Sequence, residues 1–158
     1  MRRQQGVTLV ELLVTLAVMA VLVGVVFPGF QAIVQRNDLA TTANRLVLAV
    51  SYARAEAVRT GDPMRIRAVD PAAGANEWGP GWVVEEQLAP NTLLRTFAGA
   101  PDPLFVDSVD DADEVILTGR GAVQGGTVHT FDLCIPDDDG VRVTITAIGR
   151  VDTLDIDC

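Results

Sequence analysis

Residues 7–27 read VTLVELLVTLAVMAVLVGVVF, an almost wholly apolar stretch of 21 residues that a single acidic residue, Glu11, interrupts. A helix of about 20 apolar residues matches the hydrocarbon thickness of a bilayer. Arg2 and Arg3 precede the stretch, and basic residues flank the cytoplasmic end of membrane helices. The sequence therefore predicts a membrane helix over residues 7–27, with the N-terminus in the cytoplasm and the chain after residue 28 across the membrane.

Two ordinary interpretations of this stretch leave one residue unexplained. A secretory signal peptide could end at the small-residue pattern Val18-Met19-Ala20, but the apolar run continues beyond it. A plain membrane anchor accounts for the length of the run. Neither accounts for Glu11, because an acidic side chain at the bilayer centre costs about 3 kcal/mol or more on insertion scales and calls for a partner.

The start of the chain, MRRQQG (residues 1–6) followed by VTLVELL (residues 7–13), resembles the leader and mature N-terminus of type IV pilins and type II secretion pseudopilins. The resemblance implies that a prepilin peptidase cuts after Gly6, that Val7 becomes the methylated N-terminus, and that Glu11 supports assembly. The family usually has Phe where Val7 stands. The new ammonium of one subunit and the Glu11 carboxylate of its neighbour would neutralise each other in a low-dielectric environment.

The helical pattern continues into the following segment. Gly24 weakens a helix and Pro28 bends it, so this part is expected either to loosen, as it does in fibres of the family, or to form an ordinary kink. No Gly or Pro lies between Phe30 and Thr60, Gly61 is a suitable C-cap, and Pro63 prevents continuation. Apolar residues recur near the helical period at Ile33, Leu39, Ala43, Leu46, Val47, Val50, Ala53 and Ala57. These features predict one helix over residues 7–60.

Two motifs place the chain in one branch of the family. LAVSYARAEAVRTG (residues 48–61) and WGPGWVV (residues 78–84) resemble the corresponding stretches of the GspH/FimT branch. We expect Trp78 and Trp82 to pack in the core around a tight turn and not to form a ligand site. The branch implies a minor pseudopilin at or near the tip of a type II secretion pseudopilus, which supports protein secretion.

Two alternatives stay open. The first is a type IV pilus minor pilin for pilus priming, adhesion or DNA uptake. The second is a static single-pass anchor with a periplasmic binding domain. For the pseudopilin, the implied partners are the prepilin peptidase, other minor and major pilins or pseudopilins, and the inner membrane, with the head in the periplasm and then on the fibre.

The remainder of the chain reads as short strands and turns. Together with the helix they predict an α+β fold, in which a long N-terminal helix packs on an antiparallel β-rich head. The predicted organisation is a leader (1–6), a transmembrane and assembly helix (7–27), an amphipathic continuation (28–61) and a periplasmic head (62–158). The predicted strands are 64–68, 81–87, 93–97, 114–117, 129–135 and 141–145, followed by a last strand; 107–114 is predicted as a surface loop, and Gly125-Gly126 and Asp139-Gly140 as turns. The aromatic residues available for the core are Trp78, Trp82, Phe97, Phe105 and Phe131.

The two cysteines, Cys134 and Cys158, lack the close spacing of a metal knuckle or a redox motif. In a head outside the cytoplasm, a disulfide between them is the natural interpretation. It would close the C-terminal segment and stabilise the fold by roughly 3 kcal/mol. Two reduced, buried thiols are the alternative.

The charge argues against nucleic acid as the main partner. The formal net charge is −9, and non-specific DNA binding depends on basic residues that neutralise phosphates. Gly149-Arg150-Val151-Asp152 resembles the GRxR motif of DNA-uptake minor pilins of the FimT type, but Asp152 replaces the second arginine. We therefore expect Arg150 to be a turn residue before the last strand.

No residue pattern predicts catalysis or a cofactor. His129, the only histidine, alternates with Phe131 and Leu133, which favours a packed or edge position. The run Asp137-Asp138-Asp139-Gly140 invites a calcium site, but the EF-hand spacing is absent and an acidic hairpin turn is the simpler interpretation. The sequence thus predicts a structural subunit that is not an enzyme and has no metal or cofactor.

Overall fold

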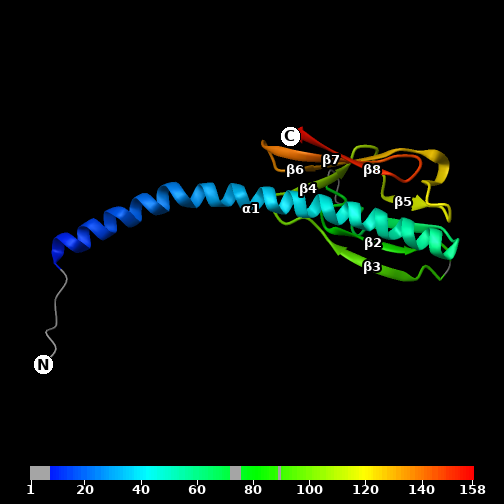
Figure 1. Ribbon diagram of the computed structural model, residues 1–158, viewed down its shortest axis with the longest axis horizontal. Helices are drawn as coiled ribbons and strands as arrows, with labels where there is room; N and C mark the ends of the chain where they lie inside the picture. The colour runs from blue at the N-terminus through cyan, green and yellow to red at the C-terminus, as the bar shows by residue number, and fades with distance from the viewer. Residues whose placement is uncertain (1–7, 72–75, 89) are drawn as a thin grey trace, which may run out of the picture. The chain divides into compact units, whose positions relative to one another are not determined.

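The computed structural model describes residues 8–71, 76–88 and 90–158 (Figure 1). The chain divides into two compact units, residues 1–35 and 36–158. The elements in chain order are α1 (Leu9–Thr60), β1 (Met64–Ala68), β2 (Gly81–Glu86), β3 (Leu93–Ala98), β4 (Phe105–Ser108), β5 (Glu114–Leu117), the 3-10 turn η1 (Gln124–Gly126), β6 (His129–Cys134), β7 (Asp139–Ile145) and β8 (Val151–Asp157).

Helix α1 confirms the prediction of one helix that continues to Thr60. The helix continues without a break through Gly24 and Pro28. At its C-terminus Gly61 adopts a left-handed conformation with φ +82°, and its N–H donates to the carbonyl of Ala57 at 2.9 Å. Glycine tolerates this conformation without a Cβ clash, which makes Gly61 an effective helix terminator.

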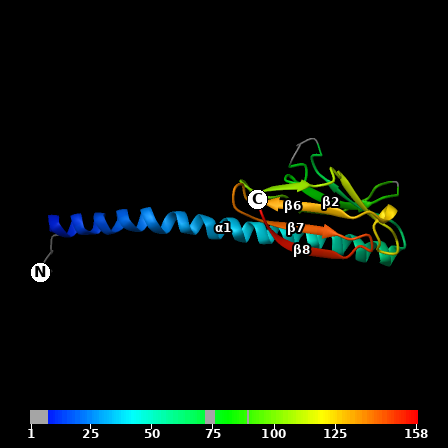
Figure 2. The ribbon, with the colours of Figure 1, turned by 90° about the horizontal axis from the view of Figure 1, so that it is seen from above.

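The head contains two four-stranded antiparallel sheets. The strand order is β3-β2-β1-β5 in the first sheet and β4-β6-β7-β8 in the second. Residues 36–60 of α1 run along both sheets (Figures 1 and 2) and bury their apolar stripe in the same core as the strands. The structure thus confirms the predicted α+β arrangement of a long helix on an antiparallel head.

The segment from Trp78 to Trp82 joins the two sheets at the centre of the core. Trp78 packs edge-on against Phe131 of β6, with ring centroids 4.8 Å apart, and Trp82 stacks on Phe97 of β3 at 6.4 Å. Both indoles are fully buried, and the Trp78 N–H donates to the carbonyl of Ala112 at 2.8 Å. Their role is core packing, as the sequence predicts.

Three local predictions are wrong. Residues 107–114 are not one loop, because Asp107 and Ser108 belong to β4. The acidic Asp107 at an outward position and the polar Ser108 at an inward one hide the strand pattern from the sequence. The Asp139-Gly140 step lies inside β7, since the hairpin turns at residues 135–138, where the N–H of Asp138 donates to the carbonyl of Ile135. Phe105 is only half-buried.

Candidate assembly site

The first turn of α1 holds the predicted assembly acid. Gly6 and Val7, the predicted cleavage and methylation residues, lie outside the described residues. Thr8 precedes the helix, and its hydroxyl accepts the N–H of Glu11 at 3.3 Å. This is one half of a capping box, in which Thr at the N-cap is followed by Glu three residues later. Glu11 therefore occupies a position where the helix dipole favours a carboxylate.

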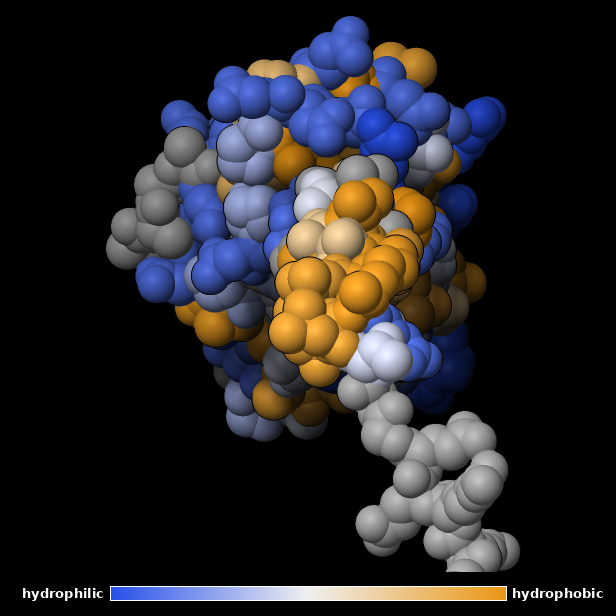
Figure 3. All heavy atoms as spheres, turned by 90° about the vertical axis from the view of Figure 1, so that its left-hand side faces the viewer, coloured by the Kyte–Doolittle hydropathy of each residue, from blue (hydrophilic) through white to orange (hydrophobic). Residues whose placement is uncertain are grey.

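Within the described part of the chain, the Glu11 carboxylate takes part in no ion pair. The helical residues around it carry exposed apolar side chains over most of the segment, and Figure 3 shows such side chains gathered on α1. The exposed large apolar residues here are Leu9, Val10, Leu12, Leu13, Val14, Leu16, Val18, Met19, Val21, Leu22 and Val23. Exposed apolar surface of this extent is typical of a contact with another protein or with a membrane.

No helix in the described ranges meets the combined length and hydropathy expected of a membrane-crossing segment. The predicted span over residues 7–27 begins outside those ranges at Val7. It stays a prediction.

A disulfide links Cys134 at the end of β6 to Cys158 after β8, with Cα atoms 5.9 Å apart. Gly140 of β7 lies directly against it, since a Cβ built at this position would overlap the Sγ of Cys158 and lie 3.1 Å from that of Cys134. The bond fastens β8 and the C-terminus to the second sheet. The structure therefore agrees with the disulfide interpretation and excludes free thiols at these two positions.

The acidic turn before β7 contacts α1. The Nε of Arg36 lies 2.9 Å from the Oδ2 of Asp139, and its Nη2 lies 3.9 Å from Asp138. The charges of this turn are thus partly neutralised by the helix. No cluster of three or more His, Cys, Asp or Glu side chains suited to a metal occurs among the described residues.

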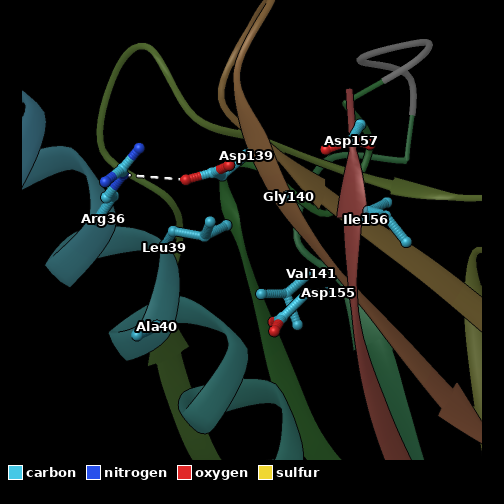
Figure 4. A pocket seen from close by; sticks show the side chains of 9 residues that line it. All are labelled: Arg36, Leu39, Ala40, Asp139, Gly140, Val141, Asp155, Ile156 and Asp157. Atoms are coloured by element: carbon cyan, nitrogen blue, oxygen red, sulfur yellow. Dashed lines mark ion pairs between the residues drawn. The ribbon is translucent and has the colours of Figure 1, made fainter.

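A groove of about 410 Å³ opens beside this ion pair, between α1 and the β7–β8 hairpin. Figure 4 shows Arg36 and Asp139 reaching toward each other across it, with side chains from the helix and both strands along its walls. Its lining mixes apolar and charged residues. Besides Arg36 and Asp139, the residues that line it are Leu39, Ala40, Gly140, Val141, Asp155, Ile156 and Asp157.

A second acidic group joins β4 to the loop between β1 and β2. Glu77 is buried and accepts the backbone N–H of Ser108 at 3.0 Å. Burial, a hydrogen bond with the Glu77 carboxyl and the nearby charges of Glu77, Asp111 and Asp132 raise the pKa of Asp107 to about 6. Asp107 also stands directly opposite Asp132 in the β4–β6 ladder. Like charges at such positions favour the protonated form of one carboxyl.

His129 and Arg150 both sit in local contacts. The Nδ1 of His129 lies 2.7 Å from the Oδ2 of Asp110, at the start of β6. Burial raises the pKa of Asp110, but hydrogen bonds from His129 and the N–H of Thr130 outweigh it and lower that pKa below its ordinary value. Arg150 pairs with Asp152 at 2.7 Å, so its charge is matched beside the acids of β8.

Sequence reasoning missed three of these features. The T-x-x-E pattern of Thr8 and Glu11 is a local signal from which the helix cap could have been predicted. The pairs Arg36–Asp139 and Glu77–Asp107 join residues far apart in the chain, so only the fold brings them together.

Comparison with known families and structures identifies the chain. The family model described as type II transport protein GspH matches residues 42–149, and the prokaryotic N-terminal methylation motif matches residues 1–27. No curated protein sequence matches the chain.

The structure is similar to that of the type IV minor pilin FimU of Pseudomonas aeruginosa strain PAO1. In its P21 crystal form the TM-score is 0.64 at 27% identity, over 74% of this chain and 88% of FimU. In the P65 form the TM-score is 0.62 at 25% identity, over 73% and 92%. With a pilin-like fold, a methylation motif and a matched GspH head, the chain belongs to the GspH family and is a minor pilin or pseudopilin.

Proposed function

We propose that the chain is a minor pseudopilin that joins a type II secretion pseudopilus at or near its tip and supports protein export. The observation that carries this proposal is the match of residues 42–149, most of the head, to the type II transport protein GspH model. The methylation motif in the same chain supplies the element that pilin-like subunits use for assembly. The role is structural and needs no catalytic residue.

Maturation begins at the N-terminus. A prepilin peptidase cuts after Gly6, and Val7 becomes a methylated N-terminal residue next to the Thr8 cap. Before assembly, residues 7–27 lie in the inner membrane with the head in the periplasm. The support for this placement is the row of exposed apolar side chains along the first turns of α1.

Assembly then gives Glu11 its partner. A carboxylate without an ion pair, set among apolar side chains, is costly in a low-dielectric environment until an opposite charge approaches. The ammonium of Val7 on a neighbouring subunit provides that charge. Gly24 and Pro28 let the helix between them loosen when the subunits pack, since Pro28 cannot donate a backbone hydrogen bond and Gly24 has low helix propensity.

A type IV pilus minor pilin is the second candidate. The similarity to FimU, which is a minor pilin of that kind, favours it. The two candidates share the leader, the helix and the head, and they differ in the machine that the subunit serves.

Deletion of the gene, with complementation by the wild-type chain, separates the candidates. A type II pseudopilin leaves folded exoproteins in the periplasm when it is deleted and keeps surface pili and twitching motility. A type IV minor pilin gives the reverse result. Normal secretion together with normal piliation would contradict both.

Intact mass tests the shared pathway. With a co-expressed prepilin peptidase, the membrane-extracted chain is expected to lose residues 1–6 and to gain one methyl group. An unprocessed mass beside an active peptidase would favour a static membrane anchor.

A further inference from the structure

Strand β8 has one free edge. It is the last strand in the order β4-β6-β7-β8, so β7 is its only hydrogen-bonded neighbour in the described sheet. It spans seven residues, five of which are exposed, and its register with β7 continues without a shift from Val151 to Asp157. A long, regular edge strand presents a row of unpaired backbone groups that another strand can bind.

The hydrogen-bond pattern shows which groups face outward. The N–H of Thr146 donates to the carbonyl of Arg150 at 2.8 Å, and the N–H of Cys158 donates to that of Asp138 at 3.0 Å. Because paired and unpaired residues alternate along an antiparallel strand, the even-numbered residues of β8 bond to β7. The N–H and C=O groups of the odd-numbered residues, Thr153 and Asp155 at the centre, therefore point to the free edge.

The side chains of these same residues lie on the face of the sheet that turns toward the core. Thr153 stands opposite Val143, and Asp155 stands opposite Val141. Val143 is fully buried, whereas Thr153 and Asp155 are exposed. At β8 the second sheet thus extends beyond the part that α1 covers. The groove lined by Leu39, Ala40 and Asp155 lies between α1 and this uncovered strand (Figure 4).

The charge of this edge favours one kind of partner strand. Asp152, Asp155 and Asp157 lie on β8. The nearby arginines are already paired, Arg150 with Asp152, Arg36 with Asp139 and Arg142 with Asp132. A second copy of this chain would bring the same acids against them, and like charges across a strand pair are destabilising. A segment rich in Lys or Arg would complement the edge and the acidic rim of the groove.

We propose that β8 receives an extended, basic segment of a different pilin-like subunit as an added strand. Alternate side chains of that segment enter the groove between β8 and α1, and the others lie beside the exposed Leu154. The proposal rests on the proposed function, since it names the surface through which this minor subunit binds a companion.

The other long edge is less suitable for strand addition. Strand β3 closes the first sheet, but its register with β2 shifts between Val84 and Glu85. The guanidinium of Arg95 in β3 lies 5.5 Å from the ring centre of Tyr52 on α1, which places a side chain between the edge and the helix. The edge strands β4 and β5 have four residues each.

Proline at position 153 tests the free edge specifically. Thr153→Pro removes an outward N–H and leaves the β7–β8 ladder intact, whereas Thr153→Ala keeps that N–H and is the matched control. The assay measures the fraction of full-length chain that co-purifies with the other pilin-like subunits of its machine. We expect a loss of about tenfold or more for the proline variant and little change for alanine.

Processing and disulfide formation are measured on the same samples by intact mass, which reports the leader and the Cys134–Cys158 bond. If Thr153→Pro is processed and oxidised yet co-purifies like the wild type, the proposal is overturned. A wild type that co-purifies with no subunit contradicts the proposed function instead.

Two further measurements stand even if the proline variant misfolds. Hydrogen–deuterium exchange of residues 151–157 is expected to slow in the wild-type assembly relative to the lone chain, and unchanged exchange would overturn the proposal. Asp155→Arg is expected to reduce co-purification several-fold, with the exposed Asp62→Arg as its control. Equal behaviour of these two variants would exclude a basic partner segment.

Discussion

Gly140 and Cys158 touch across the β7–β8 ladder, so closely that no side chain fits at position 140 while the disulfide is formed. Gly140 is also the register partner of Cys134, the other half of the bond. A glycine inside a strand normally weakens it, because it loses more backbone entropy on folding than other residues do and has no side chain to pack. Here the absence of a Cβ leaves room for the disulfide that links the C-terminus to the sheet.

Substitution of this glycine is expected to interfere with the bond. Gly140→Ala should lower the yield of the oxidised form and the melting temperature of the head, since the new methyl overlaps Sγ of Cys158. A double-mutant cycle with Cys158→Ala measures the coupling. The alanine should cost less when the sulfur is absent, although Leu133 O at 2.9 Å still limits the space. Equal costs in both backgrounds would refute the steric explanation.

The disulfide itself should stabilise the fold. Replacing both Cys134 and Cys158 with Ala is expected to reduce the free energy of unfolding by roughly 3 kcal/mol, the value for closing a loop of this length. Urea titration of the oxidised wild type and the double variant measures the difference. A difference below about 1 kcal/mol would mean that β8 is held by its ladder and packing alone.

Asp107 gives the head a pH dependence with a defined sign. Its pKa rises from the ordinary 3.8 to about 6, so the folded state binds this proton more tightly than the unfolded chain. The resulting stabilisation is complete below about pH 3.8 and is lost as the pH rises through about 6. Asp107→Asn should therefore gain stability relative to the wild type between pH 4 and pH 7.5.

The measurement for this prediction is the melting temperature of both proteins across that pH range. The exposed Asp62→Asn is the matched control and should follow the wild type. If the difference between Asp107→Asn and the wild type is the same at both ends of the range, the pKa of Asp107 is not raised in the folded state.

The helix and strands that could be predicted from the sequence are those with a local signal in it. The end of α1 at Gly61 follows from glycine and proline chemistry, and β1 and β5 have the predicted bounds because alternating apolar residues face the core. Strand β4 was not predicted over its full length because one of its outward residues is Asp107 and one of its inward residues is the buried Ser108. The turn before β7 was predicted at Asp139-Gly140 because Asp-Gly usually marks a turn, whereas it lies at residues 135–138 and the glycine makes room for the disulfide.

The candidate site divides in the same way. The roles of Gly6, Val7 and Glu11 come from a contiguous motif and could be predicted, although they stay predictions. The contacts that shape the head join distant residues, such as Arg36 with Asp139, and no local pattern announces them. The free edge of β8 belongs to this second kind, because an edge exists only once the order of the strands is known.

Two substitutions near the N-terminus separate processing from assembly. Gly6→Ala is expected to leave the leader attached, since the proposed cut follows this glycine, and the uncut chain then cannot present an ammonium at Val7. Glu11→Val is expected to be cut and methylated normally but to stay out of the fibre. Without the carboxylate, the ammonium of the neighbouring subunit has no charge partner. Glu11→Gln is the control that keeps the size and the Thr8 cap but loses the charge, so it should fail like valine. Intact mass reports the cut and co-purification with the companion subunits reports entry; normal entry of Gly6→Ala and Glu11→Val would disprove the assembly role assigned to this segment.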